Sequence, residues 1–427
     1  MTISDVHRAI DAVWRIESAR LIAGLARMLR DVGLAEEMAQ DALVIALEKW
    51  PQTGVPDNPG AWLMATAKHR AIDRLRRHKL QQRKHEELGH ELERDWQDAT
   101  AELEAAMDDD IGDDLLRLVF TSCHPLLSME ARVALTLRLL GGLTTDEIAR
   151  AYLVPEATIA QRIVRAKRTL SEADIPFVVP RGDELAERLS SVLGVIYLIF
   201  NEGYSATAGE DWMRPALCGE ALRLGRIVAE LAPDEAEVHG LVALMEIQAS
   251  RLRARTDPAG APVLLPDQDR SRWDQLLIQR GFSALLRARQ LGGSMGPYGL
   301  QAAVAACHAR AGTAEQTDWE TIAALYGALA QLNPSPIVEL NRAVAVSMAS
   351  GPAAGLELVD HLVSEPSLVN YHLLPSVRGD LLARLGRHEE AQLEFERAAA
   401  MTRNAREREF LLGRARNSAK EASLRTE

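Results

Sequence analysis

Apolar residues recur at helical spacing along much of the chain, and breaks in that spacing divide it into separate elements. The first apolar stripe ends at Asp31-Val32-Gly33, and a loop rich in Pro, Gly and Asn occupies residues 51–59. Because apolar positions three and four residues apart share one face of a helix, each stripe predicts an amphipathic helix. Helices are predicted over about residues 4–30, 35–50, from 61 onward, 115–120 and 128–140. The pattern predicts an all-α protein.

The predicted helix over 35–50 has one apolar and one acidic face. The positions predicted to be buried are Met38, Ala42, Ile45 and Ala46. The positions predicted to face outward are Glu36, Glu37, Gln40, Asp41 and Glu48. These outward positions give the predicted helix a compact acidic face.

The next predicted helix is strongly basic. Residues 61–85 contain eight Lys or Arg residues and one acid, Asp73, and Trp62 lies near the start. Basic side chains attract phosphates whatever the base sequence, and aromatic rings can stack on unpaired bases. The segment therefore fits either a nucleic-acid-binding helix or an ordinary solvated helix.

Residues 143–170 read as a short helix, a turn and a second helix. Thr144 and Glu147 have the spacing of a capping box, so the first helix is predicted to begin at residue 145. Pro155 favours a new helix start. Residues 157–170 contain four basic residues and no acid. One face of the second helix carries Ile159, Ile163, Ala166 and Leu170, and another carries Thr158, Gln161, Arg162, Arg165 and Arg168. This layout indicates a DNA-reading helix-turn-helix, with a solvated helical hairpin as the alternative.

Charge is distributed unevenly along the chain. The net charge is −12, but residues 86–114 alone hold 13 acids and one basic residue, Arg94. Because this segment has few large apolar residues, it cannot bury a core and is predicted to be a linker. The helices on either side of it remain locally basic, so the overall acidity does not exclude nucleic acid as a partner.

The composition excludes several functional classes. The three cysteines are scattered without metal-ligand spacing, and Cys123 beside His124 is better explained by a buried Cys and a turn His. No lysine follows a glycine, which excludes a P-loop, and no metalloprotease or nucleophile-elbow motif occurs. The longest apolar run, 192–200, is too short to span a membrane. We expect a cytoplasmic protein that is not an enzyme, with no metal, no cofactor and no membrane contact.

Two long stretches resemble the two conserved halves of an extracytoplasmic-function (ECF) RNA polymerase sigma factor. The first comprises AEEMAQDALVIALEKW and PGAWLMATAKHRAIDRLRR, and the second is MEARVALTLRLLGGLTTDEIARAYLVPEATIAQRIVRAKRTL. The resemblance covers about residues 5–172. It implies sigma region 2 over 1–85, an acidic linker over 86–113 and sigma region 4 over 114–172.

The resemblance also implies roles for individual residues, and it implies two partners, core RNA polymerase and promoter DNA. Glu37, Gln40 and Asp41 would dock on core RNA polymerase. The −10 promoter element would be bound by Trp62, Lys68, His69, Arg70, Arg74, Arg76 and Arg77. The −35 element would be bound by Glu156, Thr158, Gln161, Arg162, Arg165 and Arg168. Many members of the family carry Asn where His69 stands, so the base preference there is open.

Residues 173–427 extend beyond a minimal ECF sigma factor. The segment 382–391, followed by Phe395 and Ala398, resembles one tetratricopeptide repeat in which Gly386 allows close helix approach. Leu231-Ala-Pro233 and Leu332-Asn-Pro334 are expected to close helices. We therefore expect a helical-repeat extension with a concave face for a protein or peptide partner, as in the ECF subgroup with a tetratricopeptide-like extension.

Two polar segments of the extension, 201–204 and 267–273, could line a ligand pocket, but capping and loop roles are favoured. The leading hypothesis for the whole chain is a transcription initiation factor regulated through its extension. The alternative is a helix-turn-helix regulator that acts without polymerase and senses a partner or ligand through its helical repeats.

Overall fold

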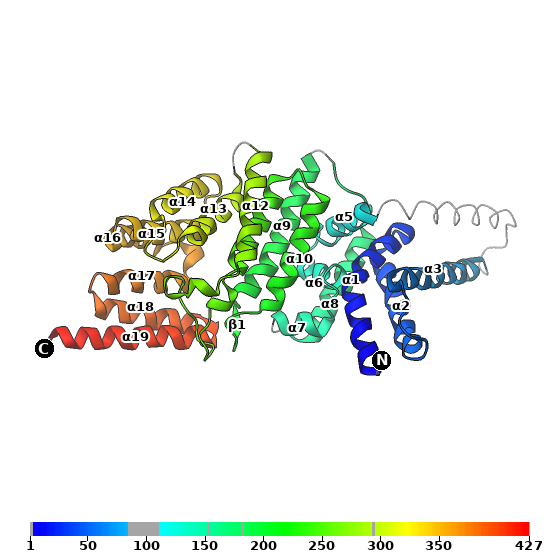
Figure 1. Ribbon diagram of the computed structural model, residues 1–427, viewed down its shortest axis with the longest axis horizontal. Helices are drawn as coiled ribbons and strands as arrows, with labels where there is room; N and C mark the ends of the chain where they lie inside the picture. Colours follow the sequence, from blue (N-terminus) through cyan, green and yellow to red (C-terminus); the bar gives the residue numbers. More distant parts are fainter. Residues whose placement is uncertain (1–2, 84–110, 153, 182, 293–294, 427) are drawn as a thin grey trace. The chain divides into compact units, whose positions relative to one another are not determined.

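The computed structural model describes residues 3–83, 111–152, 154–181, 183–292 and 295–426 (Figure 1). Within these ranges the regular structure is helical apart from one pair of two-residue strands, which confirms the predicted all-α class. The chain divides into two compact units, Met1–Ile196 and Tyr197–Glu427. Each unit has its own helical core.

Three long helices form the first part of unit 1: α1 (Ile3–Leu29), α2 (Val32–Thr53) and α3 (Pro59–Arg83). All three pack against one another, and their apolar stripes meet in a core that includes Leu25, Met38 and Leu63. The predicted break between the first two helices is confirmed. Asp31 caps α2 because its carboxylate accepts a hydrogen bond of 2.8 Å from the Leu34 amide.

The second part of unit 1 contains four shorter helices. They are α5 (Ile111–Ser122), α6 (Met129–Leu139), α7 (Thr145–Tyr152) and α8 (Glu156–Glu172). The Ser128 hydroxyl caps α6 by accepting from the Ala131 amide. Cys123 is buried and His124 accepts from the Leu126 amide in the turn, as predicted for this pair. Burial raises the pKa of the Cys123 thiol, so this side chain is an inert part of the core.

Helix α9 (Asp183–Tyr204) crosses from unit 1 into unit 2. In unit 1, the Ser191 hydroxyl donates to the Cys123 carbonyl and Arg188 donates to the Phe120 carbonyl. Unit 2 continues through α10 (Pro215–Leu231), α11 (Ala236–Ala249), α12 (Gln275–Leu291), α13 (Pro297–Arg310), α14 (Trp319–Leu332), α15 (Pro336–Ser350), α16 (Pro352–Leu362), α17 (Leu373–Arg384), α18 (His388–Met401) and α19 (Ala405–Thr426). Strands β1 (Ala208–Gly209) and β2 (Arg403–Asn404) pair in parallel.

The later helices of unit 2 pack as successive neighbours, and α17, α18 and α19 lie side by side in Figure 1. Helices α10 and α14 end at Leu231 and Leu332, before the prolines that were expected to close them. Gly386 has a φ of 77° in the turn between α17 and α18, so its role is the turn. The close helix approach lies instead at Gly379, where an added Cβ would be 3.1 Å from the Phe395 ring. The tetratricopeptide interpretation itself stays a prediction.

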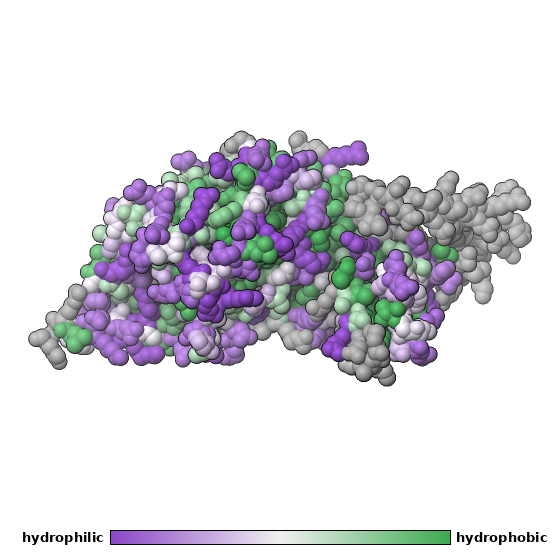
Figure 2. All heavy atoms as spheres, viewed as in Figure 1, coloured by the Kyte–Doolittle hydropathy of each residue, from purple (hydrophilic) through white to green (hydrophobic). Residues whose placement is uncertain are grey.

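Most of the predicted acidic linker, 86–113, lies outside the described residues. Among the residues that are described, no helix is long and apolar enough to cross a membrane. Hydrophilic and apolar residues are interspersed on the face of the molecule shown in Figure 2.

Candidate nucleic-acid interface

The predicted helix-turn-helix is formed by α7 and α8. The Glu147 carboxylate accepts from the Thr144 amide at 2.8 Å, and the Thr144 hydroxyl accepts from the Glu147 amide at 3.1 Å. These two reciprocal bonds are the predicted capping box, and α7 begins at Thr145 as expected. Pro155 directly precedes α8, so the second helix also begins where the sequence indicates.

The two faces of α8 have the predicted division. Ile159, Ile163, Ala166 and Leu170 are buried against the rest of unit 1. Arg165 and Gln161 are exposed, Thr158 and Arg162 are half-buried, and Glu156 is exposed in the first turn. Arg168 is exposed and its Nε lies 2.6 Å from the Glu172 carboxylate. Because exposed ion pairs of this kind are weak, this one can be exchanged for a phosphate contact.

On α3, Trp62 does not project alone into solvent. Its ring packs edge-to-face against the buried Trp50 ring of α2, with 5.3 Å between centroids. Arg70 is exposed, and Arg74 lies 2.6 Å from Glu37, with both side chains about half exposed. The side chains of Arg76 and Arg77 lie outside the described residues.

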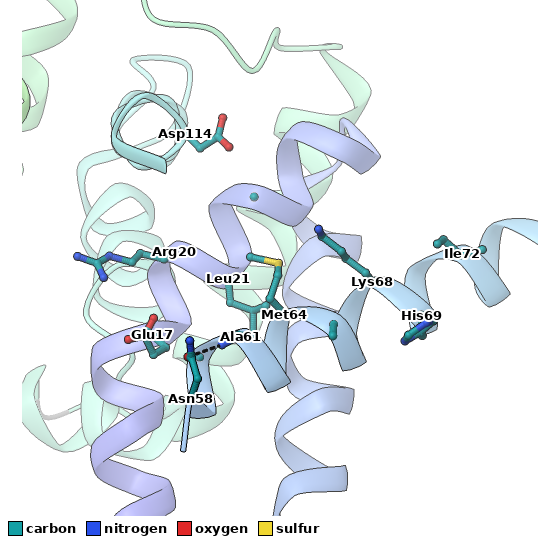
Figure 3. Close-up of a pocket in the computed structure, with 13 residues that line it drawn as sticks. Glu17, Arg20, Leu21, Asn58, Ala61, Met64, Lys68, His69, Ile72 and Asp114 are labelled. Atoms are coloured by element: carbon teal, nitrogen blue, oxygen red, sulfur yellow. Dashed lines mark hydrogen bonds between the residues drawn. The ribbon is translucent and has the colours of Figure 1, made fainter. Parts of the chain in front are cut away.

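A pocket of about 710 Å³ lies between α1, α3 and α5, and Lys68 and His69 line it (Figure 3). Glu17 and Arg20 contribute from α1 and Asp114 from α5. The loop before α3 is held by Asn58, whose side-chain oxygen accepts from the Ala61 amide at 3.1 Å. Arg20 was not among the predicted site residues, because nothing in the apolar pattern of α1 indicates that this position would line a pocket with α3.

The predicted polymerase-docking residues lie along α2. Glu37 is exposed, and Gln40 and Asp41 are half-buried. The prediction that Glu36 also faces outward is wrong, because only 3% of its surface is exposed. Its carboxylate pairs with Arg138 of α6 at 2.6 Å and with Lys167 of α8, and it accepts a hydrogen bond from Gln40. Burial of this acid is made possible by two cations from the second part of unit 1.

A second pocket, of about 520 Å³, lies between α2, α3 and α8. It is lined by Glu37 of α2, Arg74 of α3, and Lys167 and Arg168 of α8. Residues predicted for docking, for the −10 element and for the −35 element therefore meet at one place. The Ser171 hydroxyl also donates to the Asp31 carboxylate at 3.2 Å, which adds to this contact between the two parts of unit 1.

Asp114 forms another connection between the two parts of unit 1. It is buried on α5, with its carboxylate 3.2 Å from Arg27 of α1 and 2.5 Å from Arg117 of its own helix. Asp114 ends the acidic segment 86–114, whose composition gives no indication of these contacts. Across the described ranges, no group of three or more His, Cys, Asp or Glu side chains could hold a metal ion.

Three family models match the chain. They are Sigma-70 region 2 over residues 16–81, Sigma-70 region 4 over 117–170, and a family of unknown function (DUF6596) over 188–289. The first two matches contain all of the predicted DNA-binding residues of α3 and α8. The third lies in the extension and assigns it no function.

Relatives of the chain fall into two groups. An uncharacterized protein of Rhizobium meliloti (strain 1021) is 45% identical over 391 residues, which is 91% of each chain. The ECF RNA polymerase sigma factor SigK of Mycobacterium bovis is 31% identical over 36% of this chain and 78% of its own length. A probable ECF RNA polymerase sigma factor, SigI of Mycobacterium tuberculosis, is 26% identical over 40% of this chain and 57% of its own.

No solved structure matches the chain significantly. The order of the two sigma-70 regions, the helix-turn-helix in the second of them and the identity to SigK agree with one another. The chain belongs to the ECF RNA polymerase sigma factor family.

Proposed function

We propose that this chain binds core RNA polymerase and directs it to promoters whose −10 element is bound through α3 and whose −35 element is read by α8. The observation that carries the proposal is the exposed polar and basic face of α8 opposite its buried apolar face, next to the capped helix α7. We expect this activity in the cytoplasm, because core RNA polymerase and promoter DNA are located there.

The −35 contact is assigned to the outward face of α8. Gln161 and Arg165 are exposed there and carry the hydrogen-bonding groups that read bases in the major groove. Glu156 and Thr158 lie in the first turn, which is the part of a recognition helix that meets base edges. Arg162 and Arg168 are placed to contact either bases or phosphates.

The −10 contact is assigned to α3 and to the pocket beside it. A single unpaired base needs a concave site with polar groups around it, and Lys68 and His69 line such a site together with Arg20. Arg70 and Arg74 would add phosphate contacts, as would Arg76 and Arg77. Because Trp62 packs on Trp50, its role in the proposal is to hold the start of α3 rather than to stack freely on a base.

Polymerase docking is assigned to Glu37, Gln40 and Asp41 on α2. Glu37 forms an exposed ion pair with Arg74 of α3. Docking of Glu37 on polymerase would therefore release Arg74 for a contact with the −10 element. Glu36 takes no part because it is buried by Arg138 and Lys167.

Simultaneous reading of two promoter elements requires α3 and α8 to move apart. Elements centred about 25 base pairs apart are separated by about 85 Å at 3.4 Å per base pair. Arg74 and Arg168 instead line one pocket of about 520 Å³. The ion pairs of Glu36 with Arg138 and Lys167 would therefore open when polymerase is bound. The extension, residues 173–427, would then regulate how readily the factor becomes active.

The test is transcription in vitro by core RNA polymerase of the same organism on a candidate promoter. Adding the full chain should start transcripts at one position, and Arg165→Ala should weaken promoter binding by about 1–3 kcal/mol if Arg165 reads a base. Arg289→Ala, which removes an exposed arginine of α12, is the matched control and should behave as the wild type.

The same experiment separates the two functional hypotheses. Protein that binds promoter DNA equally well without polymerase, and that starts no transcript with it, would instead be a helix-turn-helix regulator. Unchanged occupancy with Arg165→Ala would remove α8 from the −35 contact.

A further inference from the structure

Three arginines gather in the extension, in the segment that joins α11 to α12. Arg251 and Arg255 flank the short 3-10 helix Leu252–Ala254, and Arg270 begins another, Arg270–Arg272. Arg251 is 8% exposed and Arg255 is 7% exposed. Arginine is rarely buried to this extent without a partner of opposite charge.

Aromatic rings hold the guanidinium groups in place. The Arg255 guanidinium carbon lies 3.5 Å from the centroid of the Tyr204 ring and 5.7 Å from that of Trp212. The Arg251 carbon lies 5.8 Å from Tyr204 and 5.9 Å from Trp273. Tyr204 and Trp273 come from the two polar segments noted in the sequence, 201–204 and 267–273. The fold thus brings both segments to one cluster.

The acidic side chains near the cluster are paired elsewhere or, like Glu315, act on Arg270 at its edge. Among the residues the structure describes, no carboxylate forms an ion pair with Arg251 or Arg255, and Glu202 on α9 pairs with Arg214. Asp269 instead has the capping role that the sequence favoured, since it accepts from the Ser271 amide. The buried positive charge is therefore not neutralised by the chain itself.

Several hydrogen-bond donors of the cluster also have no partner. Arg251 Nε, Arg255 Nη1 and Trp273 Nε1 are buried and make no hydrogen bond. Arg270 differs, because its Nη1 donates to the carbonyls of His308 and Ala311 at 2.5 and 2.8 Å. Unpaired buried donors and uncompensated charge are both costly, and one oxyanion would relieve both.

Burial limits the size of the occupant. A folded partner surface cannot reach guanidinium groups that are less than one-tenth exposed, so a small anion is the candidate occupant. Tyr204, Trp212 and Arg270 are each partly exposed, so the cluster borders solvent on the side that they form. Guanidinium groups match the planar fork of a carboxylate or two oxygens of a phosphate.

We propose that Arg251, Arg255 and the Trp273 indole nitrogen bind the oxyanion of a small molecule, a phosphate or a carboxylate, and that the extension of this sigma factor is a receptor for it. The guanidinium groups already cover the faces of the Tyr204 and Trp273 rings, so these rings cannot stack on a ring of the ligand. The site would therefore recognise the oxyanion of the ligand. Arg270 adds positive charge at the partly exposed edge.

The test is calorimetric titration of the full chain with inorganic phosphate and, separately, with succinate. Each is compared with potassium chloride at the same ionic strength, and thermal unfolding is followed in parallel. We expect saturable binding of one anion, with a matching rise in Tm, since a ligand that binds only the folded state stabilises it. The anion that saturates identifies the source of the oxyanion.

Variants assign that binding to the cluster. Arg251→Gln and Arg255→Gln should each weaken binding by about tenfold or more, because a charge-assisted hydrogen bond is lost. Arg253→Gln is the matched control, since Arg253 lies between them, in the 3-10 helix that they flank, and is exposed. It should bind as the wild type does.

Two results would overturn the proposal. One is the absence of saturable binding of either anion to the wild-type chain beyond the effect of chloride. The other is equal affinity in Arg251→Gln, Arg255→Gln and the wild type. If a Gln variant does not fold, Arg251→Lys keeps the charge but loses the fork and should still bind more weakly than the control.

Discussion

Glu36 in unit 1 and Arg251 in unit 2 are both buried charged side chains, but their surroundings are opposite. Glu36 has two cations, Arg138 and Lys167, and accepts a further hydrogen bond from Gln40. Arg251 has aromatic neighbours and two other arginines, and no acid pairs with it among the described residues. The first charge is compensated inside the chain and joins two parts of unit 1. The second is left for a partner from outside.

The difference teaches that burial alone does not define the role of a charged residue. A buried charge with internal partners contributes to the structure, and removing it leaves those partners uncompensated. A buried charge without them is itself a cost to the empty protein, and removing it relieves that cost. The two sites should therefore respond to substitution with opposite signs.

The largest effect is expected for Glu36→Ala. Arg138 and Lys167 would lose their shared acid and face each other as like charges, so the free energy of unfolding should fall by about 3 kcal/mol. Urea unfolding followed by circular dichroism measures this. Glu48→Ala, at an exposed position of the same helix, is the control and should change little. A variant as stable as the wild type would show that the contact does not hold unit 1 together.

A smaller effect on stability is expected when the pH is lowered, because His308 lies close to the arginine cluster of unit 2. Burial, together with the charges of Arg251 and Arg270, lowers the pKa of His308 to about 4. Between its usual value of 6.5 and about 4, the unfolded chain binds a proton that the folded chain does not, so stability falls as pH falls. We expect a loss of about 2 kcal/mol between pH 7 and pH 5.

The matched comparison for this pH effect is His308→Gln, measured by the same urea titrations at both pH values. This variant should lose the part of the pH dependence that belongs to His308. Identical pH dependence in the two proteins would mean that His308 is not held neutral by the cluster.

Arg251→Met tests whether removing this buried charge leaves the free energy of unfolding unchanged or raises it, in contrast to the fall expected for Glu36→Ala. Methionine removes the charge and keeps a flexible, unbranched side chain that can pack against the Tyr204 and Trp273 rings. In buffer without phosphate or carboxylates, the variant should unfold at the same or a higher urea concentration than the wild type, with a gain of about 1 kcal/mol. A clear loss of stability would show that Arg251 is compensated in the empty protein.

The smallest effect is expected for the exposed ion pair between Glu37 and Arg74. Their side chains are 48% and 52% exposed, so Glu37→Gln should change the free energy of unfolding by less than about 0.5 kcal/mol. Co-purification of the Glu37→Gln variant with core polymerase should nevertheless fall if Glu37 docks on the polymerase. Equal recovery of polymerase would remove Glu37 from the proposed docking surface.

Much of unit 1 could be predicted because its signals are local. The capping box of Thr144 and Glu147 spans three residues, and the apolar stripe of α8 repeats within one helix. The error at Glu36 has a different origin. Its partners Arg138 and Lys167 follow more than 100 positions later, and helical periodicity says nothing about which distant side chain will cover a polar face.

By itself, the sequence determined the helical class and the helix-turn-helix, because caps, turns and apolar periodicity act over a few residues. The family resemblance came from two long stretches of sequence in the right order. Only the tertiary structure decided which charges are buried and with whom. It paired Glu36 with Lys167 and placed Arg251 between Tyr204 and Trp273. The physical reason is that the cost of burying a charge depends on every group within a few ångströms, and chain folding alone brings those groups together.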